Sequence, residues 1–270
     1  MKSKLLLLTS VALMVAGMAS AQTRTWVSGT GDDLNPCSRT APCKTFAGAI
    51  SKTAAGGIIN CIDPGGFGAV TVTKSITIDC TGTLGSILAS GVQGVVVNAS
   101  GINVVLRALD INGAGTTLGT NGVNIFAAAK VDVVRTNISN FSTTGILCNS
   151  SVAANLSVVD TEIVQNSSHG INLQANCKAE IQHSYINQNG GAAVLTQAST
   201  TDANVAESYL NANGFGASAS NNSQIWLFAT QVSHNAQSVN TLTGGVVNSH
   251  GNNAILNNTT NILPPNVFTQ

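Results

Sequence analysis

Apolar and polar residues alternate along the second half of the chain, inside units that repeat. The phrase SYINQNG at positions 184–190 returns as SYLNANG at positions 208–214. Two apolar columns keep this register: Val131, Leu156, Ala179, Ala203 and Ile225, and then Val133, Val158, Ile181, Val205 and Leu227. Alternation predicts strands, and so short a unit cannot bury its apolar face alone. The pattern therefore predicts a parallel β-solenoid whose successive turns stack about 4.8 Å apart.

The last asparagine of each unit forms another column. It stands at Asn166, Asn189, Asn213, Asn235 and Asn258, so that the unit recurs at a nearly constant spacing. Phe141 occupies the corresponding position one unit upstream. Asparagine tolerates left-handed backbone geometry better than other residues with a Cβ, and stacked amides can hydrogen-bond from turn to turn. We expect a structural asparagine ladder at a bend of the chain.

Proline placement indicates the extent of the solenoid. The five prolines stand at positions 36, 42, 64, 264 and 265. A proline removes a donor from the backbone hydrogen-bond ladder and is excluded from central strands. We therefore predict the body of the solenoid over residues 58–263 and a C-terminal tail over residues 264–270.

A short amphipathic segment precedes the solenoid. Residues 44–55, ended by two glycines, predict a helix with Phe46, Ala49 and Ile50 on one face. The first turn of a solenoid would otherwise expose unpaired backbone and core side chains. We assign residues 22–57 as an N-terminal cap segment that contains this helix.

The N-terminal segment over residues 1–21 predicts a secretory signal peptide. Lys2 and Lys4 precede an apolar run over residues 5–15, and Ala19-Ser20-Ala21 supplies a small-residue cleavage site. The chain has no other long apolar stretch, so we expect no membrane span. The protein is expected to be exported, to the periplasm or the extracellular space.

Six cysteines in an exported protein predict disulfide bonds. Cys37 and Cys43 flank a short loop and are expected to pair. Ile59 and Cys61 recur as Ile78 and Cys80, and again as Val97 and Ala99. Adjacent turns would place Cys61 and Cys80 about 5 Å apart, within disulfide range. Cys148 and Cys177 remain for each other by elimination, although they share no column.

Composition excludes one class of partner. Charged residues make up 8% of the chain and the net charge is zero. A nucleic-acid-binding protein normally carries a basic stripe that neutralises phosphates, and this sequence has none. We therefore expect no nucleic-acid partner.

Four segments of the N-terminal region resemble a known family: WVSGTGDD at 26–33, PCKTFAGAI at 42–50, GGFG at 65–68 and TVTKSITI at 71–78. With the repeat, they are similar to secreted bacterial right-handed parallel β-helix repeat proteins of the pectate-lyase-like superfamily. The resemblance implies an all-β fold: a single-stranded right-handed parallel β-helix of eight or nine turns with an N-terminal capping helix. Members of known role mostly cleave, isomerise or bind polysaccharides, so polysaccharide is the expected ligand class.

The resemblance does not extend to a complete set of catalytic motifs. A lyase of this kind would need clustered acids for calcium and a basic residue, and we expect calcium only under that alternative. Otherwise we expect no cofactor and no metal site. Ser168-His169-Gly170 is similar to one motif of polygalacturonases, but their Asn-Thr-Asp and Arg-Ile-Lys motifs are absent. His169 is therefore predicted to be a turn residue.

Polar columns on the outside of the repeats supply the candidate site. The candidate catalytic residues are Asp132, Asp160, Glu180, His183 and Glu207, and the candidate ligand-binding residues are Tyr185, Tyr209 and Glu162. Tyr185 and Tyr209 should stack on adjacent turns, where an aromatic pair beside carboxylates suits a sugar ring. In the alternative interpretation this face is only solvated, and charges pair along the stack, with Arg135 over Asp160 and His183 between Asp160 and Glu207.

These residues leave three classes of function open. The main hypothesis is non-catalytic binding or scaffolding, with polysaccharide as the ligand. The alternative is a polysaccharide lyase or glycoside hydrolase that uses the acids around His183. A structural or adhesive surface protein is the second alternative, and the oligomeric state is not predicted.

Overall fold

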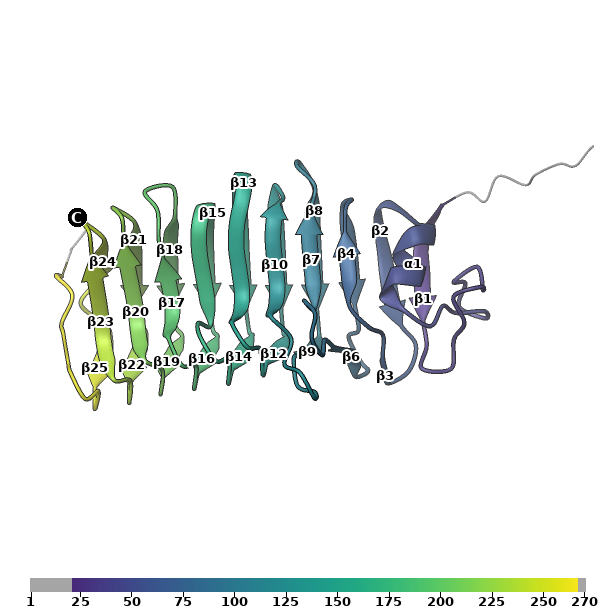
Figure 1. Cartoon of the computed structure of the whole chain (residues 1–270). Coiled ribbons are helices and arrows are strands. Elements are labelled where there is room, and N and C mark those ends of the chain that lie inside the picture. The colour runs from purple at the N-terminus through teal and green to yellow at the C-terminus, as the bar shows by residue number, and fades with distance from the viewer. Residues whose placement is uncertain (1–20, 267–270) are drawn as a thin grey trace, which may run out of the picture.

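The computed structural model describes residues 21–266 as one elongated parallel β-solenoid. The predicted signal peptide, apart from Ala21, and the stretch 267–270 lie outside the described residues. Figure 1 shows the strands as a stack that runs from the N-terminal to the C-terminal end. All registered strand pairs are parallel. The solenoid that the repeat predicts is therefore confirmed.

The strands form two sheets, of sixteen and nine strands. The larger sheet comprises β1 (Gln22–Val27), β2 (Thr53–Cys61), β4 (Val70–Val72), β5 (Ile76–Asp79), β7 (Val95–Asn98), β8 (Asn103–Arg107), β10 (Asn121–Ala127), β11 (Lys130–Val134), β13 (Thr144–Val159), β15 (Ile171–Gln182), β17 (Ala192–Thr196), β18 (Asp202–Ala206), β20 (Phe215–Ser220), β21 (Gln224–Phe228), β23 (Gln237–Leu242) and β24 (Val246–Ser249). The smaller sheet comprises β3 (Gly65–Gly66), β6 (Gly85–Leu88), β9 (Leu109–Asn112), β12 (Asn137–Ser139), β14 (Glu162–Val164), β16 (Tyr185–Asn187), β19 (Tyr209–Asn211), β22 (Gln231–Ser233) and β25 (Ala254–Leu256).

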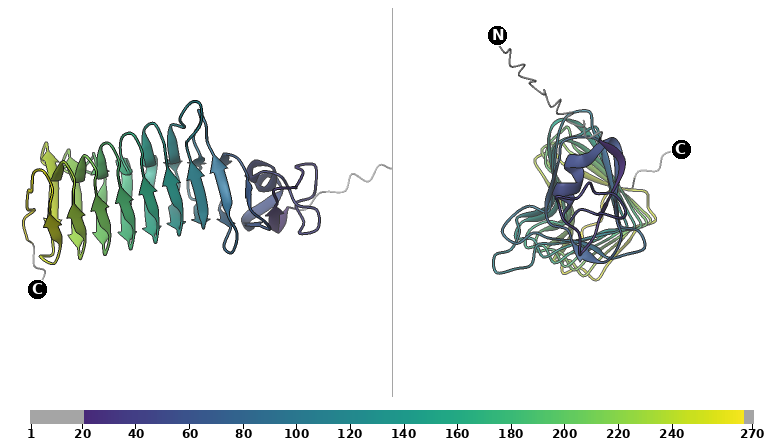
Figure 2. Two further views of the ribbon diagram at one scale, coloured as in Figure 1. Left: turned by 90° about the horizontal axis from the view of Figure 1, so that it is seen from below. Right: turned by 90° about the vertical axis from the view of Figure 1, so that its right-hand side faces the viewer.

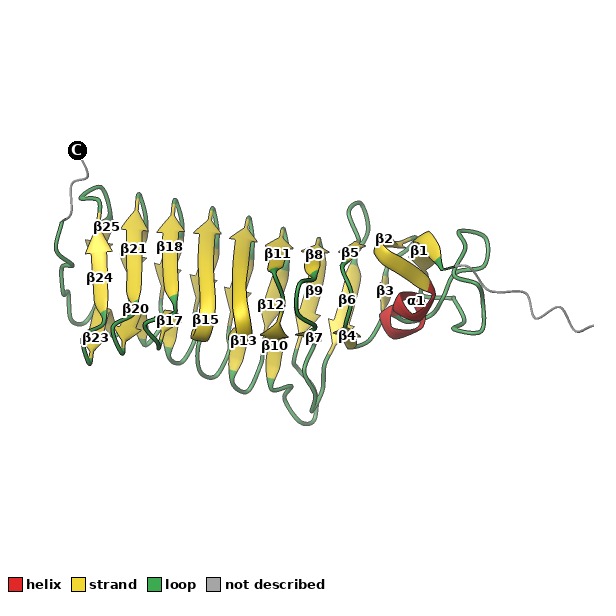
Figure 3. Ribbon diagram, turned by 90° about the horizontal axis from the view of Figure 1, so that it is seen from above, coloured by secondary structure: helices red, strands yellow, loops and turns green. Residues whose placement is uncertain are grey.

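Each complete turn has three sides. The first side consists of β4, β7, β10, the beginnings of β13 and β15, β17, β20 and β23. The second side consists of β5, β8, β11, the ends of β13 and β15, β18, β21 and β24. The nine-stranded sheet is the third side. The long strands β13 and β15 run along two sides, which joins the first and second sides into one sheet (Figure 3).

The core consists of the columns that the alternation predicts. Val133, Val158, Ile181, Val205 and Leu227 stand in one register, and the column two residues earlier does the same. The members of both columns are at most 2% exposed. Like side chains therefore stack on like from turn to turn, and their burial, together with that of the inward columns of the other two sides, stabilises the solenoid.

The asparagine ladder forms in the predicted register, with the expected amide bonds from turn to turn, but the asparagines are not the left-handed residues. The Nδ2 of each ladder residue from Asn166 to Asn235 donates to the Oδ1 of the next, at 2.9 to 3.1 Å. The same Oδ1 atoms accept backbone N–H groups. The left-handed residue is the one before each asparagine: Gln165, Gln188, Ala212, His234 and Asn257, with φ of 57° to 59°. The asparagines therefore satisfy buried backbone groups at the bend and do not themselves make the bend.

A second ladder stands at the opposite end of each short third-side strand. It consists of buried hydroxyl residues, Thr136, Thr161, Ser184, Ser208 and Thr230. Each hydroxyl donates to the carbonyl two residues earlier, at 2.7 to 3.1 Å. Four of them also accept a backbone N–H from the neighbouring turn. The sequence shows this column, but its role as a ladder was not predicted.

The N-terminal helix is shorter than predicted. Helix α1 spans Phe46–Lys52, with Phe46 and Ala49 fully buried and Ile50 packed against the core. It lies across the N-terminal end of the stack, as the view along the axis shows (Figure 2). The chain turns into β2 already at Thr53, because the Thr53 N–H and hydroxyl both bond to the Ala49 carbonyl.

Strand β2 pairs in parallel with β1. Gly56 and Gly57 therefore lie inside a strand, and the solenoid begins upstream of residue 58. At the other end, Asn266 forms an isolated parallel bridge with Ser249. No helix among residues 21–266 is long and apolar enough to cross a membrane.

All three expected disulfide bonds form. The Cα–Cα distances are 4.6 Å for Cys37–Cys43, 4.8 Å for Cys61–Cys80 and 6.2 Å for Cys148–Cys177. Disulfides are typical of proteins exported to an oxidising compartment.

The extension of the Cys61 column to Val97 was wrong. Ile78 is in register with Leu106, whereas Val97 belongs to the first side. The spacing that relates Cys61 to Cys80 holds for one step only, because the next turn of the chain is longer.

Candidate functional site

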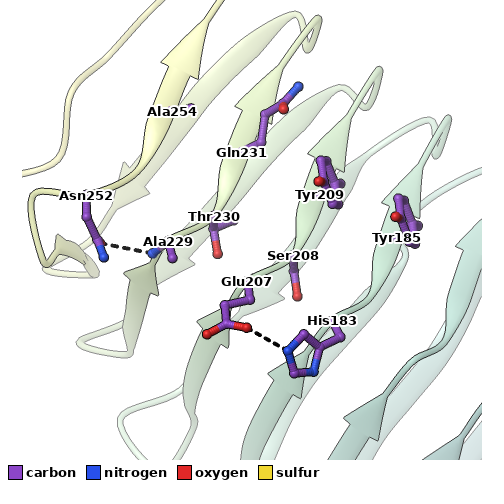
Figure 4. A pocket seen from close by; sticks show the side chains of 10 residues that line it. All are labelled: His183, Tyr185, Glu207, Ser208, Tyr209, Ala229, Thr230, Gln231, Asn252 and Ala254. Carbon is purple, nitrogen blue, oxygen red and sulfur yellow. Dashed lines mark hydrogen bonds and ion pairs between the residues drawn. The ribbon is translucent and has the colours of Figure 1, made fainter.

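Two tyrosines stack on neighbouring turns of the third side. Tyr185 on β16 is in register with Tyr209 on β19. The two rings are parallel within 1°, their centroids are 4.8 Å apart, and they are 48% and 38% exposed. The strand spacing imposes this stacking, because both side chains leave their strands in the same direction (Figure 4). The pair presents a flat aromatic surface to solvent.

His183 and Glu207 lie beside this aromatic surface, at the corner between the second and third sides. His183 Nε2 is 2.6 Å from Glu207 Oε2. Both residues have left-handed backbones, with φ of 48° and 49°, as does Asp160 at 50°. This conformation costs a residue with a Cβ roughly 1–2 kcal/mol. The following hydroxyl ladder holds the corner and projects these side chains outward.

The corner and the tyrosines line two adjoining surface cavities. An open cavity of about 490 Å³ is lined by His183, Tyr185, Glu207, Tyr209 and Gln231, among others. A second cavity, of about 730 Å³, is lined by Asp160, Thr161, Glu162, His183 and Tyr185. Because His183 and Tyr185 line both cavities, the two lie next to each other along the solenoid axis. We call the two together the corner groove.

The structure brings most of the predicted site residues together. Of the eight candidates, Asp160, Glu162, His183, Tyr185, Glu207 and Tyr209 line the corner groove. Glu162 is in register with Tyr185 and therefore extends the tyrosine column toward the N-terminus. Carboxylates, an imidazole and aromatic faces thus meet in one surface depression.

The other two candidates lie on the second side. Asp132 is 2.9 Å from Lys130, and Glu180 accepts a hydrogen bond of 2.6 Å from Asn204. Glu180 lines a separate cavity next to Trp226. The expectation that Asp132 and Glu180 surround His183 was therefore wrong. The repeat fixes which residues stack, but the bend at His183 turns these two side chains to another side.

The predicted charge pairing along the corner also holds only in part. Among residues 21–266, His183 pairs with Glu207, and no ion pair joins Arg135 to Asp160. The Arg135 guanidinium instead donates to the Thr81 hydroxyl at 3.4 Å. Asp160 is therefore left without a cationic partner within this part of the chain.

Other polar residues of the groove were missed by sequence reasoning. Ser208, Thr230 and Asn252 line the groove beside Glu207. Ser208 and Thr230 belong to the buried hydroxyl ladder, so their hydroxyls are already committed to backbone carbonyls. The side-chain oxygen of Asn252 accepts the Ala229 N–H at 2.9 Å (Figure 4). Asn252 stands six residues before the ladder residue Asn258, the position that His183 and Glu207 occupy in their units, so the repeat could have marked it.

His169 lies on the first side, away from the groove. Its Nδ1 accepts the Ala192 N–H at 2.9 Å, and burial lowers the pKa of the imidazole. This bond joins two adjacent turns. The expectation of a local, noncatalytic role agrees with this position.

The groove does not fit the calcium site that a lyase of this family would need. In the stretch 21–266, no three His, Cys, Asp or Glu side chains converge as metal ligands. Asp160 and Glu162 share one turn and Glu207 lies two turns away, so the three carboxylates line the groove instead of surrounding a point. Calcium stays a prediction of the lyase alternative, and no step is derived through it.

The chain matches several solved structures. The chain is similar to the pectate lyase Pel9A with a TM-score of 0.68 and 14% identity, over 84% of this chain and 67% of that one. It also matches a rhamnogalacturonan lyase, with a TM-score of 0.45 and 9% identity over 83% and 74% of the two chains. A third match is the A-module of the mannuronan C-5 epimerase AlgE6 of Azotobacter vinelandii, with a TM-score of 0.37 and 13% identity over 78% and 88%.

No family model and no curated protein matches the chain. At 14% identity, the likeness to Pel9A establishes the parallel β-helix fold and confirms the predicted fold class.

Proposed function

We propose that this chain is an exported enzyme that binds a polysaccharide along the corner groove and cleaves it by general acid–base catalysis. One observation carries the proposal: the His183–Glu207 pair and the stacked tyrosines line the same groove. A sugar ring presents C–H groups that pack on an aromatic face, and its hydroxyls bond to carboxylates and amides. The three disulfides and the fold shared with a pectate lyase support an exported, polysaccharide-directed role.

The His183–Glu207 contact is the kind of pair that moves protons. A carboxylate that accepts the Nε2–H fixes one tautomer of the imidazole and stabilises the charged ring. Within the described residues, no hydrogen bond engages His183 Nδ1, so this nitrogen is open to substrate. A positioned acid or base of this type contributes about 10²–10⁴-fold to a rate. Simple binding would not require such a pair, so the geometry favours the catalytic alternative over non-catalytic binding.

Cleavage assays on a panel of polysaccharides test the proposal. Newly formed reducing ends are measured for the wild type, for Glu207→Gln and for Glu180→Gln. Glu180 is the matched control, because it is an exposed carboxylate on another side that also has one side-chain partner, the Asn204 amide. We expect Glu207→Gln to slow cleavage by about 10²-fold or more and Glu180→Gln to leave it unchanged.

Three results would contradict the catalytic proposal. Equal slowing by both variants would show that the groove is not the reaction site. Glycan binding without newly formed reducing ends would favour the hypothesis of non-catalytic binding. Absence of both binding and cleavage across the panel would favour a structural or adhesive role.

A further inference from the structure

The corner groove carries only one sign of fixed charge. Its charged lining residues are Asp160, Glu162 and Glu207, together with His183. Among the described residues, no lysine or arginine lines either cavity. Asp160 and Glu162 are exposed and form no ion pair within this part of the chain. A ligand that enters the groove therefore meets two free carboxylates.

Three nearby cations form ion pairs on the second side, and a fourth, Arg135 at the corner, donates to the Thr81 hydroxyl. Arg107 contacts Asp79 at 3.4 Å, Lys130 contacts Asp132 at 2.9 Å and Lys178 contacts Asp202 at 3.1 Å. Each of these ion pairs lies on second-side strands. The strand register thus places these three basic side chains beside acids of their own side, and neither they nor Arg135 line the groove.

This charge distribution is unsuited to an acidic polysaccharide. Each sugar of a polyuronate carries a carboxylate, which would lie against Asp160 and Glu162 without a compensating cation. Elimination from a uronate also needs positive charge at the carboxylate while the neighbouring proton is removed. Over the described range 21–266, the groove contains neither a basic side chain nor a set of metal ligands.

We infer that the substrate of the corner groove is a polysaccharide that carries amines and no carboxylates. A sugar ammonium group finds Asp160 and Glu162 as charge-assisted acceptors. The face of Tyr185, in the same groove, attracts a cation through its π-system. The inference rests on the proposed function of this groove and specifies its substrate class.

A substrate without carboxylates restricts the reaction to hydrolysis. The oxygen of water forms a bond to the anomeric carbon while the glycosidic C–O bond breaks. One proton of water passes to a base, and the leaving oxygen receives a proton from an acid. Asp160 and Glu207 stand one turn below and one turn above His183, so their Cα atoms are about 10 Å apart. These two carboxylates and His183 are the groups that exchange the protons.

Binding of three oligosaccharides of equal length tests the inference: one of amino sugars, one of neutral sugars and one of uronates. The probe is the wild-type protein, measured by calorimetry at neutral pH and low salt. We expect affinity to fall in that order, with at least about tenfold between the first and the last. Added salt should weaken binding of the amino-sugar oligosaccharide and strengthen binding of the uronate oligosaccharide, because screening reduces both the attraction and the repulsion between charges.

A double variant, Asp160→Asn with Glu162→Gln, sharpens the test. The ratio of its affinities for the amino-sugar and the neutral oligosaccharide should fall by about tenfold. Its melting curve checks that it still folds. Tighter or equal binding of the uronate by the wild type, or no gain of the amine over the neutral ligand, would overturn the inference and leave the proposed function standing. Binding of none of the three would overturn both.

Discussion

The turns before and after Ala108 make their corners in different ways. Between residues 53 and 107, every residue with positive φ is a glycine, namely Gly56, Gly68, Gly82, Gly91 and Gly101. Between residues 108 and 243, every such residue has a side chain. Glycine makes a left-handed corner without strain, whereas other residues need neighbours that hold them there. The asparagine and hydroxyl ladders supply that support in the C-terminal region.

This difference shows where the solenoid displays chemistry. A glycine corner presents no side chain, so the N-terminal turns have nothing to place at the position of His183. In the C-terminal turns the ladders hold Asp160, His183 and Glu207 at the corner. The structural ladders and the candidate site are therefore parts of one arrangement.

Removal of one ladder asparagine should have the largest effect on stability. Asn213 donates to two carbonyls and to Asn235, and its Oδ1 accepts both nitrogens of Asn189. Asn213→Leu would leave several buried groups unpaired, at about 1–3 kcal/mol each. We expect a loss of roughly 3–5 kcal/mol in the free energy of unfolding, measured with denaturant.

The exposed Asn204 is the matched control for this substitution. Asn204→Ala should change the free energy of unfolding by less than about 0.5 kcal/mol. An equal response of the two variants would mean that the ladder does not support the C-terminal corners.

The Cys61–Cys80 disulfide is the corresponding support of the N-terminal region. It links β2 to the turn after β5, across a sequence separation of 19. Replacement of both cysteines by alanine should cost roughly 2–4 kcal/mol. Amide exchange should increase in β2 and β5 and stay unchanged in β19. Increased exchange along the whole solenoid would contradict the division into two differently supported regions.

The aromatic surface should contribute to ligand binding only in the C-terminal region. Tyr185→Ala should weaken retention on the polysaccharide that the wild type binds by about tenfold, equivalent to about 1.4 kcal/mol. Phe228→Ala is the control, because this ring is similarly exposed, at 43%, but lies on the second side. Loss of retention in the control alone would move the binding surface to the second side.

Acid should weaken the two regions at different pH. Burial lowers the pKa of His169 below its ordinary value of 6.5. Above pH 6.5 the His169 imidazole is neutral in both the folded and the unfolded state. Below pH 6.5 His169 binds a proton in the unfolded state more readily than in the native state, so the free energy of unfolding falls. Melting temperatures measured from pH 7 to 5 should therefore decline less for His169→Gln than for the wild type, whereas the exposed His234→Gln should behave like the wild type.

The N-terminal region should respond to stronger acid. Hydrogen bonds from Ser28 and Gly29 lower the pKa of Asp63. Burial alone would raise the pKa of Asp33, but hydrogen bonds from Thr45 and Lys44 outweigh it and the net shift is downward. Both carboxylates thus stabilise the fold above about pH 4, and this stabilisation is lost as pH falls through their lowered pKa values. These pKa shifts would be contradicted if, as the pH is lowered, the N-terminal region lost stability at a higher pH than the C-terminal region.

The sequence predicted the C-terminal turns better than the N-terminal ones for a physical reason. Ladder residues must recur in every turn, so Asn166 and Asn189 mark the period directly. Glycine corners do not mark the period in this way. When the spacing between Cys61 and Cys80 was extended by one more step, it assigned Val97 to the wrong side of the solenoid. The helix was predicted too long because composition did not reveal that Thr53 ends it by pairing with Thr25 and with Ala49.

The candidate site was predicted in part. Stacking of Tyr185 on Tyr209 follows from the repeat alone, because residues one period apart must lie in register. The angle at the corner does not follow from the period, so Asp132 and Glu180 were grouped with His183 although they lie on another side. The left-handed φ of His183 was not predicted, because even histidine, which is enriched among non-glycine residues with positive φ, adopts this conformation only in a minority of cases.

A crystal structure of the Glu207→Gln protein with a bound amino-sugar oligosaccharide tests the central claim most directly. The account predicts sugar rings along the corner groove, with one ring against Tyr185 or Tyr209 and an ammonium group at Asp160 or Glu162. An oligosaccharide that occupies the second side beside Trp226, and leaves the groove open, would contradict it.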